Sequence, residues 1–281
     1  MGRPIFADAV LAVRIERAEC RLLADSAAAA ARRREHSGVV VREIAGGVAT
    51  YTGPGSPLNK LAGLGFAGAV DEDDLAGVER SFGERGVPVQ AEVASLADPS
   101  VCATLTRRGY VLKNFENVLG RALPSAGERR IGAEIEVSVG DDGSLAAWLD
   151  VIVTGFADPD TQGVPTHETF SREALEQPIV DMAAAAGFVR YLAHRDGVLA
   201  GGASLRLSDG VALLCGSATL PAHRRRGVQS ALLGRRLADA ADHGCDIAVV
   251  TTQPGSKSQE NVQRQGFSLL YTRAILVQEA R

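Results

Sequence analysis

One stretch of eleven residues, HRRRGVQSALL (residues 223–233), combines residue types that could do chemistry. Three consecutive arginines precede Gly227, and small and aliphatic residues that favour a helix follow it. The first backbone N–H groups of a helix have no intrahelical partner and lie at the positive end of the helix dipole, so they attract anions. Glycine lets the main chain approach an anion closely because it has no Cβ. The pattern predicts an anion site at residues 224–230.

Three explanations of the arginines are open from this stretch alone. They could bind nucleic acid, bind a nucleotide diphosphate, or face solvent at the start of a helix. The chain has a formal net charge of −4, whereas non-specific nucleic-acid binders are usually basic. Three cations at the start of a helix oppose its dipole, which favours a bound anion over a solvated surface. The sequence contains neither GxxxxGK[ST] nor a GxGxxG after a strand, so it predicts no P-loop and no dinucleotide fold. We therefore expect a phosphate-type anion site and no nucleic-acid partner, and the identity of the phosphate compound stays open at this point.

Composition sets wider limits on the class of protein. The chain has 281 residues, 46% of them hydrophobic, which favours two globular domains. Four cysteines (Cys20, Cys102, Cys215 and Cys245) lie far apart without a CxxC pair, so we expect free thiols and no metal site. No apolar run is long enough to span a membrane, and the N-terminus is a poor signal peptide. A cytoplasmic protein without membrane contact is the expectation.

Hydrophobic periodicity and turn residues predict an alternation of helices and strands. In the first half we expect helix over residues 5–35, strands over 38–53, a strand or loop over 58–66, helix over 71–86, strand over 87–96, helix over 98–109 and strand over 110–123. In the second half we expect strand over 131–139, helices over 143–156 and 171–187, strands over 188–195, 197–207 and 210–220, helix from the arginine stretch to about 243, strand over 245–252, helix over 255–266 and strand over 267–278. Asp-Gly pairs at 196–197 and 209–210 predict tight hairpin turns.

An internal repeat indicates two copies of one fold. At a constant shift, Val262, Arg264, Gly266, Phe267 and Leu269 fall on Leu105, Arg107, Gly109, Tyr110 and Leu112. We place domains at residues 1–124 and 125–281, with a turn-rich linker at 124–130. The copies differ at the anion motif, where the first copy has no arginine and carries Asp71, Glu72, Asp73 and Asp74. Those carboxylates would repel a phosphate, so we expect the first copy to be degenerate.

The order strand, RRRGVQ, long helix, apolar strand, short helix, GF, strand resembles the GCN5-related N-acetyltransferase (GNAT) family. The family signature Gln/Arg-x-x-Gly-x-Gly/Ala is matched by residues 224–229, with Gln229 in place of the last small residue. The resemblance covers residues 131–278. It implies an α/β (α+β) chain of two GNAT-like domains, each with a mixed, mostly antiparallel central sheet flanked by helices.

The resemblance also implies the ligand and its contacts. In the family this loop cradles the pyrophosphate of acetyl-CoA, and the preceding strand, here residues 216–220, binds the pantetheine amides. An Asn in the later short helix commonly lies near the cofactor. The residues that the resemblance implies for acetyl-CoA are Ala218, Thr219, Leu220, Arg224, Arg225, Arg226, Gly227, Val228, Gln229, Ser230 and Asn261.

The catalytic acid and base stay unassigned. Many family members use a tyrosine as general acid, but Val262 occupies that position, and Tyr271 on the last strand is interpreted as a packing residue. The acids of the early helices of the second half are interpreted as surface charges, and Cys215 as a structural thiol without an evident base. His223 is equally consistent with phosphate contact and with solvent exposure. The early-helix acids are Glu168, Glu173 and Asp181.

From the resemblance we expect an acyl-CoA-dependent N-acyltransferase that moves acetyl from acetyl-CoA directly to a primary amine of a small molecule. The alternative is a non-catalytic CoA-binding or regulatory protein that kept the cofactor loop, an interpretation that Val262 favours. The acceptor amine cannot be identified from the sequence. Either a monomer or a homodimer is consistent with a tandem chain.

Overall fold

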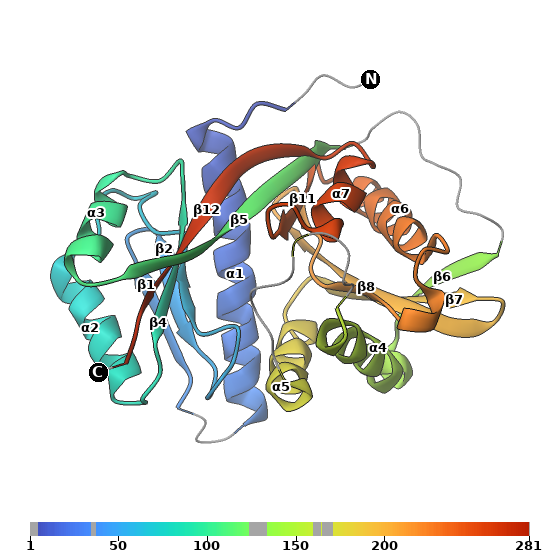
Figure 1. The fold of residues 1–281 in the computed structure, drawn as a ribbon, viewed down its shortest axis with the longest axis horizontal. Helices are drawn as coiled ribbons and strands as arrows, with labels where there is room; N and C mark the ends of the chain where they lie inside the picture. The colour runs from blue at the N-terminus through green and yellow to red at the C-terminus, as the bar shows by residue number, and fades with distance from the viewer. Residues whose placement is uncertain (1–4, 35–37, 124–133, 160–163, 165–170, 281) are drawn as a thin grey trace. The chain divides into compact units, whose positions relative to one another are not determined.

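The computed structural model describes residues 5–34, 38–123, 134–159, 164 and 171–280, which form two compact units (Figure 1). The N-terminal unit consists of the described residues within 6–118 and 269–280, and the C-terminal unit consists of those within 119–268. The expected linker at residues 124–130 lies outside the described residues. The chain is a mixed α/β protein whose sheets are mostly antiparallel and flanked by helices.

The N-terminal unit begins with a long helix that Asp8 caps, since its carboxylate accepts from the N–H of Leu11 at 2.8 Å. Its elements are α1 (Ala9–Arg33), β1 (Val40–Ile44), β2 (Gly47–Tyr51), β3 (Lys60–Ala62), α2 (Glu72–Gly83), β4 (Val89–Ala94), α3 (Ser100–Arg107), β5 (Val111–Ala122) and β12 (Ser268–Gln278). The strand order is β1-β2-β3-β4-β12-β5. Strands β3 and β4 are parallel, whereas the pairs β1–β2, β2–β3 and β4–β12 are antiparallel. Helices α2 and α3 pack a core of buried aliphatic and aromatic side chains against this sheet.

The C-terminal unit has a sheet covered by helices on both faces. Its elements are β6 (Ile135–Val139), α4 (Leu145–Ala157), α5 (Arg172–Ala183), β7 (Phe188–Arg195), β8 (Val198–Ser208), β9 (Val211–Leu213), β10 (Ser217–Thr219), α6 (Val228–Asp242), β11 (Ile247–Thr252) and α7 (Lys257–Gln263), with short 3-10 turns at Asp142–Ser144 and Pro221–His223. The strand order from the end of β5 is β11-β9-β8-β7-β6, and β10 pairs with β8.

Two neighbouring glycines of β8 show how closely these layers approach. A Cβ at Gly201 would meet Val228 and Leu232 of α6, whereas a Cβ at Gly202 would meet Trp148 of α4. Successive strand residues face opposite sides of a sheet, so α6 covers one face and α4 the other. Figure 1 shows α6 and α4 on opposite sides of β8.

The segment 210–220, expected as one strand, is divided into β9 and β10. The N–H of Ser204 on β8 donates to the carbonyls of both Cys215 (3.2 Å) and Gly216 (3.0 Å), so two residues oppose one. Gly216 has φ +33° at this point. This arrangement is a β-bulge, which bends the strand away from its neighbour.

The internal repeat has a matching local geometry in both copies. Gly109 and Gly266 follow α3 and α7 with φ of +89° and +86°. The N–H of Tyr110 donates to Leu105 O at 3.0 Å, and the N–H of Phe267 donates to Val262 O at 3.2 Å. Both aromatic residues are 4% exposed. Each copy thus ends a helix with a left-handed glycine and anchors the next strand with one buried ring.

The final strand lies in the unit of the other copy. Residues Arg273–Gln278 of β12 pair antiparallel with Val89–Ala94 of β4. The compact units therefore differ from the sequence division at residue 124, because residues 269–280 belong to the N-terminal unit. None of the helices within the described residues is long and apolar enough to cross a membrane.

Candidate cofactor site at the start of α6

Helix α6 begins without a side-chain cap. Its N-cap residue is Gly227, in the left-handed region at φ +85°, and no side chain bonds to the first N–H groups. The first intrahelical bond runs from the N–H of Ala231 to Gly227 O at 3.0 Å. The preceding N–H groups are thus those of an open helix N-terminus, which favours negative charge. Gly227 itself is exposed, so this end of the helix faces solvent.

The three arginines have different environments. The Nε of Arg224 donates to Thr219 O at 3.3 Å, and its guanidinium also contacts Asp158 O, so Arg224 is held against the main chain. Arg225 is exposed with φ +61°, a left-handed conformation that is uncommon without glycine. Arg226 is exposed. Arg224 therefore positions the loop, while Arg225 and Arg226 place charge at its surface.

Strands β10 and β11 part just before this loop. Residues Val211–Leu213 of β9 pair parallel with Ile247–Val249 of β11, and the N–H of Leu214 still donates to Val249 O at 2.8 Å. After the bulge, β10 is paired only with β8 among the described strands. The edge of β10 that turns away from β8, and the last residues of β11, can therefore bond to an extended ligand through main-chain groups.

A buried arginine stabilises the main chain at the bulge. Arg236 of α6 is 3% exposed, and its Nη1 donates to Ser204 O at 3.0 Å. The Oγ of Ser204 donates in turn to Cys215 O at 2.7 Å. Burial lowers the pKa of Arg236 to about 10, and because this value still lies above neutral pH the guanidinium is charged there. Arg236 thus fixes the main chain where the strands part.

Unpartnered polar atoms gather around the same place. Among the described residues of the C-terminal unit, the buried side-chain atoms without a hydrogen-bond partner are Thr219 Oγ1, His223 Nδ1 and Thr252 Oγ1. Thr219 is the last residue of β10, His223 is the last residue of the Pro221–His223 turn, and Thr252 is the last residue of β11. Buried polar groups almost always have partners, so this concentration indicates a ligand-binding region.

These features fit an acyl-CoA. The open N-terminus of α6 and the exposed arginines suit a diphosphate, and the unpaired edge of β10 with its two neighbouring hydroxyls suits an arm that carries amides. The described residues bring together no group of three His, Cys, Asp or Glu side chains that could hold a metal ion.

The remaining sequence-predicted contacts fall into two groups. Gln229 accepts a hydrogen bond from Ser217 Oγ at 3.0 Å, and the N–H of Leu220 donates to Ala200 O at 3.0 Å, so both help to fix the loop. The side chains of Ala218 and Val228 are buried in the core, which leaves only their main-chain groups for a ligand. Ser230 is exposed on α6, and Asn261 is half-buried on α7 with no described contact to the loop. The cofactor contacts of all these residues stay predictions.

The catalytic candidates are mostly placed away from such a role. Val262, at the position of the family tyrosine, is 8% exposed and packs in the core. Tyr271 is a buried packing residue as expected, it belongs to the N-terminal unit, and burial beside Glu16 raises its pKa, which makes it a poor proton donor. The Sγ of Cys215 contacts Leu213 O at 3.5 Å.

One expectation about the early-helix acids is wrong. Asp181 is completely buried in α5 rather than a surface charge, whereas Glu173 is exposed at the start of that helix. Hydrogen bonds from its own N–H and from Ser171 lower the pKa of Glu173, so it is ionised at neutral pH. Glu168 lies outside the described residues.

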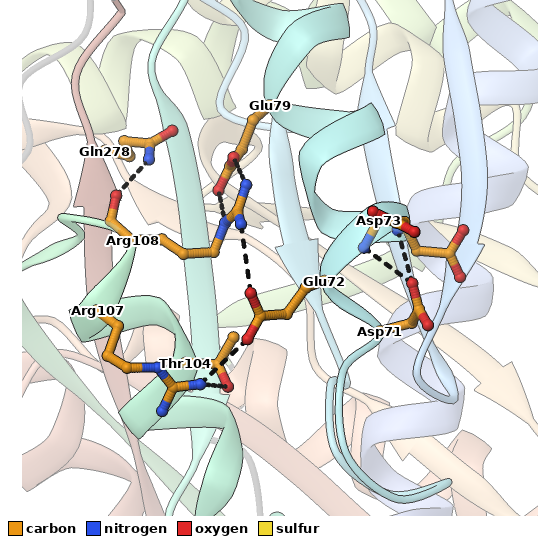
Figure 2. A network of polar contacts seen from close by, with 9 residues as sticks. Asp71, Glu72, Asp73, Glu79, Thr104, Arg107, Arg108 and Gln278 are labelled. Carbon is orange, nitrogen blue, oxygen red and sulfur yellow. Dashed lines mark hydrogen bonds and ion pairs between the residues drawn. The ribbon is translucent and has the colours of Figure 1, made fainter.

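Helix α2 of the N-terminal unit starts in the opposite way (Figure 2). The carboxylate of Asp71 accepts from the N–H groups of Asp73 and Asp74 at 2.9 and 3.0 Å, so it occupies the anion position of the helix. Glu72 pairs with Arg107 at 3.2 Å, and Arg108 pairs with Glu79 at 2.5 Å. Carboxylates of the protein thus accept hydrogen bonds from the first N–H groups of α2 and form ion pairs with the neighbouring Arg107 and Arg108.

Thr252 was not identified from the sequence, and Ser217 was included only as part of the strand 216–220. Thr252 ends an apolar run, VVTT, and a polar residue at the carboxyl end of a buried strand is a known position for ligand contacts. That signal was present in the sequence. The contact between Ser217 and Gln229 depends on the bulge, which a continuous apolar pattern does not reveal.

Comparisons with known proteins give a consistent result. The family model described as "Acetyltransferase (GNAT) family" matches residues 156–267. A GCN5-related N-acetyltransferase from Kribbella flavida is similar in structure, with a TM-score of 0.60 at 17% identity, covering 90% of this chain and 95% of that one. A tandem GNAT protein from the clavulanic acid biosynthesis pathway has a TM-score of 0.60 at 12% identity, covering 98% of this chain and 97% of that one. A search of curated proteins gave no match.

A third solved structure, a GCN5-related N-acetyltransferase from Sphaerobacter thermophilus, has a TM-score of 0.57 at 14% identity and covers 74% of this chain and 67% of that chain. At these identities the structural likeness concerns the fold. Residues 156–267 are thus similar in sequence to the acetyltransferase (GNAT) family, and nearly the whole chain is similar in fold to a solved tandem GNAT protein.

Proposed function

We propose that this protein is an acyl-CoA-dependent N-acetyltransferase that transfers acetyl from acetyl-CoA to a primary amine of a small molecule. The observation that carries the proposal is the open start of α6 at Gly227, beside the parted strands β10 and β11. Acetyl-CoA supplies, when bound, an activated thioester. The N–H groups at the start of α6 would hold its diphosphate, and main-chain groups of Ser217–Thr219 would align its arm.

The N-terminal unit has a different part in this proposal. Because Asp71 already accepts from the first N–H groups of α2, a phosphate there would have to displace a carboxylate and face neighbouring acids. We propose that this unit binds no CoA and acts as a degenerate copy.

Substitution of Gly227 tests the cofactor site. Gly227→Val places a branched side chain at φ +85°, which valine resists, and sets a Cβ beside the anion position, so we expect CoA affinity to fall by more than about tenfold. The matched control is Gly244→Val, because Gly244 follows the other end of α6 with φ +75° and open space around it. Isothermal titration with CoA measures the effect. Equal affinity in the wild type and Gly227→Val would contradict the site.

A non-catalytic CoA-binding protein is the second candidate, since the buried Val262 replaces the tyrosine of many family members. Release of CoA thiol from acetyl-CoA, measured against a panel of primary amines, separates the two. Amine-dependent thiol release supports the transferase, and CoA binding without any release across the panel supports the second candidate.

A further inference from the structure

A small cavity in the N-terminal unit lies between helix α1 and the chain segments that follow β1 and β3. Its volume is about 50 Å³. A single water molecule fills roughly 10–15 Å³ of such a cavity, so this one holds a group of about three to five non-hydrogen atoms. The residues that line it include Val13, Glu16 and Arg17 of α1, Gly46 of the β1–β2 turn, and Gly63 and Phe66 after β3.

Glu16 offers this cavity a carboxylate oxygen that has no donor. The residue is 2% exposed, and Tyr271 OH and Arg273 Nε both donate to its Oε1. Its Oε2 has no hydrogen-bond partner. Burial raises the pKa of Glu16 more than Arg273 and Tyr271 lower it, so a further positive group would stabilise the ionised carboxylate. A buried oxygen without a donor indicates a donor that comes from outside the chain.

Arg17 supplies the opposite charge. It is exposed, so its guanidinium lies at the solvent side of the cavity, whereas Glu16 is buried beneath α1. Adjacent residues of a helix do not face each other, so these two charges flank the cavity and do not form an ion pair with each other. Val13 and Phe66 add apolar surface to its wall. The cavity therefore combines an acceptor of positive charge, a donor to negative charge and a short apolar contact.

This combination suits a small zwitterion. Arg17 would repel a ligand that is only a cation, and Glu16 would repel one that is only an anion. A free α-amino acid carries an ammonium and a carboxylate on one carbon, and glycine, the smallest, has about the size that the cavity holds. We propose that the cavity binds a small free α-amino acid, whose ammonium donates to Glu16 Oε2 and whose carboxylate accepts from Arg17. This site lies in the unit that binds no CoA, and it does not depend on the proposed function.

Isothermal titration of the full chain with glycine tests the site, with methylamine and acetate as probes that each carry one of its two charges. We expect glycine to bind at least about tenfold more tightly than either probe, because each probe lacks one charge-assisted hydrogen bond.

Two substitutions on α1 test the residues. Arg17→Gln removes the guanidinium and Val13→Phe fills the cavity, so each should weaken glycine binding by more than about tenfold. Both leave the buried pair of Glu16 and Arg273 intact, which a substitution of Glu16 itself would disturb. The matched controls are Arg32→Gln and Val10→Phe at exposed positions of the same helix, which should bind glycine as the wild type does.

Thermal unfolding followed by circular dichroism provides a second readout. A ligand that binds only the folded protein raises its Tm, so glycine should raise the Tm of the wild type more than that of Val13→Phe. The general effect of glycine as a co-solvent is common to both proteins. Equal affinity for glycine and methylamine, or unchanged glycine affinity in Arg17→Gln, would overturn the inference. An absence of glycine binding would also overturn it and would leave water as the occupant. A wild type that binds glycine but no CoA would contradict the proposed function alone.

Discussion

Glu116 of β5 lies near Glu92 and Lys60 in the N-terminal unit. The pKa of each carboxyl group depends on the charges of the other two side chains. Lys60 Nζ contacts Glu92 Oε1 at 2.5 Å, and both groups are largely buried. Burial opposes the charge on Glu92, but Lys60 and Arg273 outweigh it and lower its pKa. Burial, and then the negative charge of Glu92, raise the pKa of Glu116 to about 7. Two neighbouring carboxyl groups thus have opposite shifts.

This raised pKa makes stability depend on pH. The folded protein holds the Glu116 proton more tightly than the unfolded chain, so the contribution is fully present below about pH 4.5 and is lost as the pH rises through about 7. Glu116→Gln keeps a neutral group at every pH. We expect the variant to match the wild type at pH 4.5 and to exceed its free energy of unfolding by about 1–3 kcal/mol at pH 8.

Urea unfolding followed by circular dichroism at both pH values measures this difference. Titrating groups that do not interact with Glu116 are common to both proteins and cancel in the comparison. Glu92 does interact with Glu116, so its response is part of the measured difference. A difference between variant and wild type that does not change from pH 4.5 to pH 8 would show that Glu116 does not titrate in this range.

At the scale of single elements, α2 and α6 differ in what accepts hydrogen bonds from their first N–H groups. Both helices begin with unsatisfied N–H groups, which Asp71 satisfies in α2 and no side chain satisfies in α6. Asp71→Ala should lower the free energy of unfolding of the N-terminal unit by about 1 kcal/mol, the usual effect of losing an N-cap. CoA affinity should not change, because the variant leaves α6 intact.

The control is Asp73→Ala, which keeps the N–H that Asp71 accepts from (Figure 2). Chemical denaturation measures stability, and titration with CoA measures binding. If Asp71→Ala made the chain bind a second CoA, α2 would be a latent cofactor site rather than a lost one.

Periodicity and turn chemistry predicted most of the elements. The Asp-Gly turn at 196–197 has left-handed φ values of +53° and +76°, and Gly109 and Gly266, which the repeat aligns, share a left-handed conformation. The division of residues 210–220 was not predictable, since both halves are apolar and Gly216 was the single signal of a bulge. Asp181 was misjudged because an acidic residue in a helix pattern gives no sign of whether its side chain is buried.

The candidate site was predictable to a similar extent. The arginine-glycine stretch indicated an uncapped helix start, because local sequence determines the conformation at Gly227. The sequence did not indicate that Arg224 would be held by Thr219 O and Asp158 O, nor that Thr252 would close the neighbouring strand. These contacts depend on pairing between distant segments, which local patterns do not encode.

At the scale of the whole chain, the last strand completes the unit formed by the first helix. Arg273 of β12 donates from Nε to Glu16 Oε1 of α1 at 2.8 Å, across 257 residues of sequence, and Tyr271 OH donates to the same oxygen at 2.7 Å. Arg273 and Glu16 are each 2% exposed at their side chains. The pattern of β12 predicted a strand but not its partner, because hydrophobic alternation carries no information about which strand lies beside it.

A double-mutant cycle tests how strongly this pair joins the two ends of the chain. Arg273→Met leaves Glu16 as an uncompensated buried carboxylate, so we expect the free energy of unfolding of the N-terminal unit to fall by about 3–5 kcal/mol. In the Arg273→Met/Glu16→Gln double variant the charge is gone while the amide oxygen can still accept from Tyr271. The double variant should therefore be less destabilised than the sum of the single changes, with a coupling of at least about 1 kcal/mol.

An exposed pair of the same unit supplies the comparison. Arg107 and Glu72 lie 3.2 Å apart with side chains 62% and 60% exposed, so Arg107→Met should cost less than about 1 kcal/mol (Figure 2). Urea unfolding followed by circular dichroism reports both units, and Trp148 fluorescence reports the C-terminal unit separately. Additive effects of Arg273→Met and Glu16→Gln would mean that β12 is held by strand pairing and apolar packing alone, and that the buried ion pair contributes nothing specific to its place beside β4.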